Sequence, residues 1–204
     1  MVPSIRKADQ QLIQIVDAAL VEAKRKSGDW LVCRPGCTQC CIGPFAISQL
    51  DALRLRQGLS DLEAADPARA LRVKNRARAS VTRLSADFPG DAKTGILAED
   101  PASEARFAGF ADDEPCPALD PATGLCDLYA ARPMTCRTFG PPVRSASEGA
   151  LGVCELCYHG ASDEEIAACE MTPDPDDSES ALLKRAEEKT GTRGNTIVAF
   201  CLAK

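Results

Sequence analysis

The sequence predicts a mainly α-helical chain in which helices frame an irregular, loop-rich cysteine-cluster centre. Apolar residues recur at helical spacing in several segments, aromatic residues make up only 4% of the chain, and proline and glycine interrupt the cysteine-rich segments. A core with few aromatic residues packs most simply through Leu, Ala, Val and Ile on helix faces. We expect residues 1–204 to form a single domain, with the cysteine-rich core at about 30–160 and helices flanking it.

Two helices are predicted on either side of the first cysteine block. Residues 8–27 place apolar side chains at helical spacing, and Gly28 follows as a stop signal. Residues 31–46 are expected to be irregular because proline and glycine interrupt them. Ser48 can cap the next helix, which we expect over about 48–58.

The middle of the chain predicts a basic helix followed by a loop. Ser60 and Glu63 have the spacing of a capping box, which predicts a helix from residue 60 to about 86, bent or restarted near Pro67. Its many arginines predict a solvated face, or a contact with an acidic partner or with another part of this chain. Residues 87–115 combine Pro, Gly and acidic residues and predict a surface loop.

Turn and cap signals also divide the C-terminal part. Residues 120–124 have turn chemistry, and residues 162–165 form a second capping box that opens a short helix to about 170. A last helix is predicted over 177–190. The apolar tail 196–204 predicts a strand or a docked helical turn.

The chain contains eleven cysteines, a number that is odd and below the proportion of a small disulfide scaffold. The N-terminal residues reach charged and amide side chains before any apolar run, so no secretory signal is visible. No apolar stretch has the length of a membrane span. We therefore expect a cytoplasmic protein with reduced thiols, in which clustered cysteines indicate metal or redox chemistry.

The charge balance disfavours a nucleic-acid partner. The chain has 24 basic and 30 acidic residues, a formal net charge of -6 and an isoelectric point near 4.9. An acidic chain repels phosphate backbones at long range. We expect metal ions as partners and no membrane partner, and the sequence leaves a protein partner open.

Eight cysteines fall into two blocks with metal-ligand spacing. A Cys-x2-Cys loop brings two thiolates to one ion with little strain, whereas adjacent cysteines project their side chains in different directions. Eight thiolates are enough for two tetrahedral zinc sites, or for a 4Fe–4S cluster with further sites, and both alternatives stay open. The blocks are Cys33-x3-Cys37-x2-Cys40-Cys41 and Cys116-x9-Cys126-x9-Cys136-x17-Cys154.

The other cysteines and the only histidine are weaker candidates. Cys157 lies three positions after Cys154 and could complete the ligand set in its place. Cys169 and Cys201 stand apart and are predicted to be ordinary buried cysteines. His159 follows Cys157 closely, which is the only reason to consider it as a ligand or an acid–base group.

Three arginines lie beside the predicted ligands. Arg34, Arg132 and Arg137 could offset the negative charge of a thiolate site. The alternative for each of them is an ordinary surface ion pair.

Three motifs occur in a fixed order along the chain. They are the first cysteine block, Cys116-Pro117-x-Leu119, and Gly124-x-Cys126-x-x-Tyr129-x-x-Arg132-Pro133-x-x-Cys136-Arg137. This ordered pattern resembles the YkgJ-type cysteine-cluster family over about residues 30–157, and leaves both terminal helices outside. Members are described as zinc- or iron-chelating domains. The resemblance implies that the ligands are Cys33, Cys37, Cys40, Cys41, Cys116, Cys126, Cys136 and Cys154.

Three functions follow from these features. The first is a metal-binding protein that chelates zinc or iron, including a 4Fe–4S cluster, in a structural, sequestering or delivering role. The second is a metal- or iron–sulfur-dependent enzyme of redox or group-transfer chemistry, since flagellin lysine N-methylases carry a related motif. Its catalytic residues are unknown, with Tyr129, Cys157 and His159 as first candidates, and the chain has no S-adenosylmethionine fingerprint. The third is a metal-stapled protein-interaction module that uses the basic helix.

Overall fold

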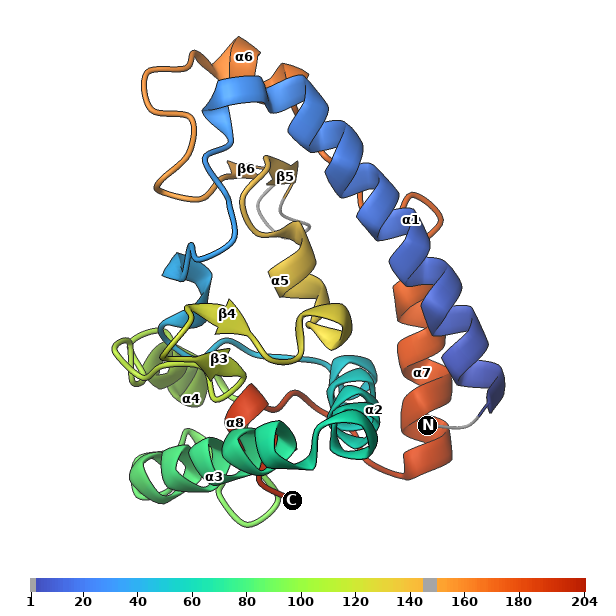
Figure 1. Cartoon of the computed structure of the whole chain (residues 1–204), viewed down its shortest axis with the longest axis vertical. Helices are drawn as coiled ribbons and strands as arrows, with labels where there is room; N and C mark the ends of the chain where they lie inside the picture. The colour runs from blue at the N-terminus through green and yellow to red at the C-terminus, as the bar shows by residue number, and fades with distance from the viewer. Residues whose placement is uncertain (1–2, 145–149) are drawn as a thin grey trace. The chain divides into compact units, whose positions relative to one another are not determined.

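The computed structural model describes residues 3–144 and 150–204 and confirms the mainly helical fold, with 53% helix and 8% strand (Figure 1). The chain divides into two compact units. The first unit comprises Pro35–Pro133 with Ala186–Lys204, and the second comprises Val2–Arg34 with Met134–Arg185. The single domain expected over 1–204 stays a prediction, and its residues 1–2 and 145–149 lie outside the described residues.

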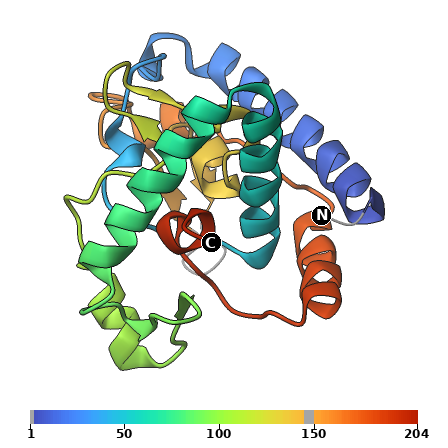
Figure 2. The same cartoon turned by 60° about the horizontal axis from the view of Figure 1, so that its bottom comes forward.

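Three helices form the core of the first unit. They are α2 (Gln49–Ala65), α3 (Pro67–Leu84) and the short α8 (Val198–Leu202). The predicted cap is confirmed, because the Asp51 N–H donates to the Ser48 hydroxyl at 3.2 Å. Figures 1 and 2 both show α8 against α2 and α3. The apolar tail is therefore a docked helical turn, which is one of its two predicted forms.

The start of α3 corrects the sequence prediction. The capping-box residues Ser60 and Glu63 lie inside α2, which continues to Ala65. The new helix begins at Pro67, and the Asp66 carboxylate accepts its Arg69 N–H at 3.0 Å. Proline lacks an N–H and disfavours helical backbone in the residue before it, so the α2–α3 break lies here.

Helical periodicity separates two faces of α3. Its buried positions repeat every three or four residues, so they form one stripe against the core. Most of this stripe packs into a cluster that includes Ile47, Leu55, Leu59, Leu128 and Leu202. Its last residue, Leu84, belongs to a second apolar cluster. The buried residues of α3 are Ala70, Val73, Ala77, Ser80 and Leu84.

The segment 87–115 is more ordered than the predicted loop. It contains a hairpin of β1 (Gly90–Asp91) and β2 (Ile96–Leu97), and then α4 (Pro101–Phe107). Asp100 caps α4, because its carboxylate accepts two N–H groups of the first turn. An aspartate followed by proline is a helix-start signal, which the abundance of loop-forming residues obscured.

The remaining elements of the first unit contain cysteines or adjoin them. The segment 31–46, which belongs to this unit from Pro35 onward, is irregular as predicted, apart from the short helix η2 (Gln39–Cys41). The predicted turn at 120–124 joins β3 (Leu119–Asp120) to β4 (Leu125–Cys126), and η3 (Tyr129–Ala131) follows.

The second unit is built on α1 (Pro3–Ser27), which begins earlier than predicted and ends before Gly28 as predicted. Helix α1 packs against α5 (Met134–Thr138), where Arg137 is buried and donates to the Asp17 carboxylate at 2.6 Å. The other elements are η1 (Gly28–Trp30), the β5–β6 hairpin (Val143–Arg144 and Leu151–Gly152), α6 (Asp163–Ala168) and α7 (Ser178–Thr190), which continues into the first unit.

Candidate metal centre

Two segments distant in the sequence meet in the first unit and bring Cys41 beside Cys116. The Cys116 N–H donates to the Cys41 carbonyl oxygen at 2.7 Å. The adjacent residues Ile42 and Pro115 form an antiparallel β-bridge. Main-chain hydrogen bonds therefore join the first cysteine block to the start of the second. The spacing of the cysteines in the sequence does not predict this pairing.

The β3–β4 hairpin presents Cys126. In its turn, the Asp120 carboxylate accepts the Ala122 N–H at 3.1 Å and the Thr123 hydroxyl at 2.9 Å. Gly124 has a φ of 68°, in the left-handed region that favours glycine. These contacts fix the turn and thereby the end of the strand that carries the cysteine.

The β1–β2 hairpin uses the same turn without a cysteine. The Asp91 carboxylate accepts the Lys93 N–H at 2.9 Å and the Thr94 hydroxyl at 2.8 Å, and a glycine follows. Leu97 occupies the position that Cys126 occupies in the other hairpin. Both hairpins have the sequence Asp-x-x-Thr-Gly, so the turn signal at residues 120–124 also occurs at residues 91–95.

Four thiols of the first unit lie close enough to change one another's pKa. A hydrogen bond between the two side chains lowers the pKa of Cys40 and raises the pKa of Cys41. Burial raises the pKa of Cys116 to about 12 and also raises the pKa of Cys126. Negative charge on Cys40 raises the pKa of both of these thiols further. Four soft sulfur atoms in mutual range are a donor set that suits zinc or iron.

Arg132 supplies positive charge to this group of thiols. Its side chain is almost fully buried and lies 4.0 Å from the centroid of the exposed Tyr129 ring. The guanidinium charge lowers the pKa of Cys40 and of Cys126. Arg132 thus takes the charge-offsetting position, which is one of the two roles that the sequence left open for it, and Tyr129 stacks against its guanidinium group.

The second unit holds another group of cysteines. Cys154, Cys157 and Cys169 are buried in one cluster with Leu31 and Tyr158, and the partly buried Cys33 packs against it. The predicted ligands Cys33 and Cys154 are thus brought together, while Cys136 lies on α5 of the same unit. The predicted ligand Cys37 lies in the first unit.

Some residues of this cluster were missed or judged differently from sequence. Cys169 is buried as predicted, but beside other cysteines rather than alone. Tyr158, at a left-handed φ of 59°, forms a hydroxyl hydrogen bond with Ser27. No sequence signal pointed to either contact, because both depend on how the chain returns to residues 27–33. His159 is exposed.

Across residues 3–144 and 150–204, no three Cys, His, Asp or Glu side chains are already arranged to hold a metal ion. All eleven cysteines lie within these ranges, and none of them forms a disulfide. By donor chemistry, Cys40, Cys41, Cys116 and Cys126 fit a zinc or iron ion.

A mainly helical chain with reduced cysteines gathered from two sequence blocks defines a cysteine-cluster protein. The chain belongs to the CxxCxxCC family, described as a "Putative zinc- or iron-chelating domain", which matches residues 32–157. No curated protein and no solved structure matches the chain. Within the described residues, no helix combines the length and apolar character needed to cross a membrane.

Proposed function

We propose that this chain is a cytoplasmic zinc- or iron-chelating protein, and that Cys40, Cys41, Cys116 and Cys126 hold one metal centre in its first unit. The main-chain hydrogen bond from the Cys116 N–H to the Cys41 carbonyl oxygen at 2.7 Å, within the segment that matches the chelating-domain family, is the observation that carries the proposal. The influence of these thiols on one another's pKa values is consistent with it. The β-bridge beside Cys41 and the hairpin that carries Cys126 give them a shared main-chain framework.

The other predicted ligands extend this proposal. Cys33, Cys136 and Cys154 belong to the second unit, where Cys157 and Cys169 add two more buried thiols. The eight-cysteine ligand set implied by the family resemblance therefore stays a prediction, with a further thiolate site in the second unit as its extension.

Zinc bound by four thiolates would be structural, whereas iron and sulfide bound by the same residues would give an iron–sulfur cluster with electron-transfer chemistry. We propose both forms for the same thiols, because zinc and iron–sulfur clusters accept the same ligands. Anaerobic purification distinguishes them: a brown protein with broad visible absorption contains the cluster, and a colourless, zinc-loaded protein contains the ion.

Metal analysis of the anaerobically purified chain and of Cys116→Ser tests the proposal. We expect at least about one equivalent of zinc or iron per wild-type chain, and a clear loss in the variant because one soft ligand is removed. Less than about half an equivalent of zinc plus iron in the wild type would overturn the proposal.

Cys201→Ser is the matched control. Cys201 is also buried in the first unit, but it lies on α8 and its thiol donates to the Ala52 carbonyl oxygen at 3.3 Å. Serine can keep this hydrogen bond, so the metal content should equal that of the wild type. Equal metal loss in both variants would indicate a general effect on folding.

A further inference from the structure

We propose that Arg76 and Asp127 are positioning residues for the metal centre, and that α3 uses them to fix the spacing between Cys116 and Cys126. The proposal rests on the metal centre proposed above. It adds residues that do not bind the metal themselves but hold the segments that carry its ligands. It concerns the basic face of α3, for which the sequence predicted a solvated surface, or a contact with an acidic partner or with another part of this chain.

Arg76 connects the residues that directly follow the two cysteines. Its Nε donates to the Pro117 carbonyl oxygen at 2.9 Å, and its Nη2 donates to the Asp127 carboxylate at 2.5 Å. A guanidinium group is planar and rigid, so two bonds from one fork fix two acceptors relative to each other. Arg76 thus ties the main chain after Cys116 to the side chain after Cys126.

Asp127 is held from several directions. Its side chain is only 2% exposed, and Arg69 donates to its second carboxylate oxygen at 2.5 Å. Its own N–H donates to the Ala118 carbonyl oxygen at 2.7 Å. A buried carboxylate with two guanidinium partners has few alternative positions, because losing either partner leaves charge without compensation.

The supporting helix is itself fixed. Arg69, Arg76 and Arg83 are spaced by seven residues and therefore lie on one face of α3. Arg83 completes the row through a bond of 2.6 Å to Glu114, just before Cys116. The buried stripe of the helix runs beside this row and packs into the core, so these arginines extend from a rigid support.

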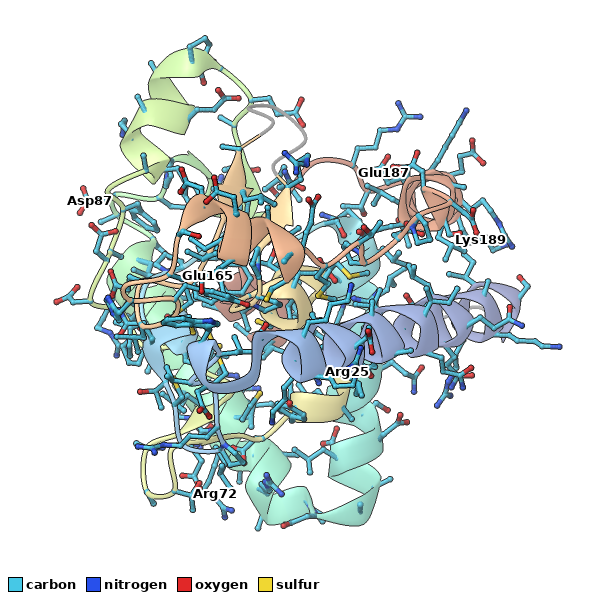
Figure 3. The ribbon with its side chains drawn as sticks, turned by 90° about the horizontal axis from the view of Figure 1, so that it is seen from above. Arg25, Arg72, Asp87, Glu165, Glu187 and Lys189 are labelled. Atoms are coloured by element: carbon cyan, nitrogen blue, oxygen red, sulfur yellow. The ribbon has the colours of Figure 1, made fainter. Side chains whose placement is uncertain are left out.

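Arg72 provides a matched control on the same helix. It carries the same charge, but it is exposed, and Figure 3 shows its side chain on the outside of the ribbon. A general electrostatic effect of basic α3 residues would act through Arg72 as well. An effect through position would be confined to Arg76, Asp127 and Arg69.

The experiment compares Arg76→Gln, Asp127→Asn and Arg72→Gln in the full chain. Zinc affinity is measured by chelator competition, cobalt(II) absorption reports the thiolate coordination, and thermal melting is followed without metal. We expect Arg76→Gln and Asp127→Asn to weaken zinc binding by about 10- to 100-fold and to change the cobalt spectrum, as loss of residues that hold metal ligands in place does. Arg72→Gln should match the wild type in both readouts.

Zinc affinity and a cobalt spectrum equal to wild type in Arg76→Gln would overturn the inference while the proposed function stands. A lower melting temperature with unchanged affinity would also overturn it, because Arg76 would then be structural only. Absence of metal from the wild type would overturn the proposed function and this inference together.

Arg69→Gln is the second variant, used if Arg76→Gln does not fold. It removes a partly exposed partner of Asp127. Weaker zinc binding in Arg69→Gln supports the inference, and unchanged zinc binding overturns it.

Discussion

Gly58 lies within α2, where this helix contacts η3. A Cβ atom added to Gly58 would lie 2.3 Å from the Ala131 Cβ, well inside van der Waals contact. Glycine inside a helix costs about 1 kcal/mol relative to alanine, so propensity alone disfavours it here. The close approach of two backbones explains this glycine and helps to place Arg132, which directly follows η3.

We expect Gly58→Ala to destabilise the chain by about 1–3 kcal/mol, because the overpacking outweighs the gain in helix propensity. Urea denaturation measures this change in the free energy of unfolding. The double variant Gly58→Ala, Ala131→Gly should recover much of the loss, since it removes the opposing Cβ atom. A Gly58→Ala protein that is more stable than wild type would show that this contact does not limit packing.

Individual residues also show what sequence patterns can reveal. Cysteine spacing identified the two blocks, and the segments that meet in the first unit belong to them. The grouping of Cys157 and Cys169 with Cys33 depends on tertiary packing around Leu31, which local spacing does not encode. Similarly, a basic helix face does not disclose that Arg76 pairs with Asp127, because the partner lies on another element.

Among the secondary-structure elements, the two Asp-x-x-Thr-Gly hairpins are a natural pair for comparison. Hydrogen bonds from backbone and threonine lower the pKa of Asp91 and of Asp120 below the usual 3.8. Because the folded pKa is lowered, this support for the turns is complete at neutral pH and is lost as the pH falls through the folded value.

Thr123→Ala and Thr94→Ala should both lower the melting temperature, because each removes a hydroxyl that bonds to the turn aspartate. Only Thr123→Ala should weaken zinc binding, by about 10-fold, since only that hairpin carries a proposed ligand. Chelator competition and thermal melting measure the two effects. Equal loss of zinc affinity in both variants would contradict a specific role of the Cys126 hairpin.

Element boundaries followed the cap signals where these were unambiguous. Ser48 caps α2, and Ser162 opens α6 through the predicted capping box. The pattern at Ser60 failed because α2 had already begun, and the Asp66–Pro67 pair supplies the stronger start for α3. Helix α4 was missed for a related reason, since its Asp100–Pro101 start lies among turn residues.

For the whole molecule, the first unit couples its proposed metal centre to its helices through chain topology. Cys41 and Cys116 are joined by a main-chain hydrogen bond, and the chain between them contains α2, α3 and α4. A metal ion bound by cysteines from both ends of this loop would stabilise the native state. Wherever it stayed bound, it would also reduce the conformational entropy of the unfolded chain by closing the loop.

Removal of metal by a strong chelator should therefore lower the thermal midpoint of the wild-type chain. The reason is that a structural zinc site contributes up to ~10 kcal/mol to the free energy of unfolding. Circular dichroism in the helical band measures the transition, and added zinc should restore it. The Cys116→Ser chain should melt near the metal-free midpoint with or without chelator. If neither chelator nor zinc changes the midpoint, metal binding does not stabilise the folded chain and this prediction is wrong.

The paired hairpins have a consequence for how such a site could arise or be rebuilt. The β1–β2 hairpin ends in Leu97, which belongs to one apolar core cluster. The β3–β4 hairpin ends in Cys126, which packs against another apolar core cluster. Replacing the last residue of such a hairpin by cysteine would thus turn a hairpin that only contributes to the core into one that offers a sulfur ligand. Placing cysteine at Leu97 would be a direct way to engineer an additional thiol on a scaffold that the protein already builds twice.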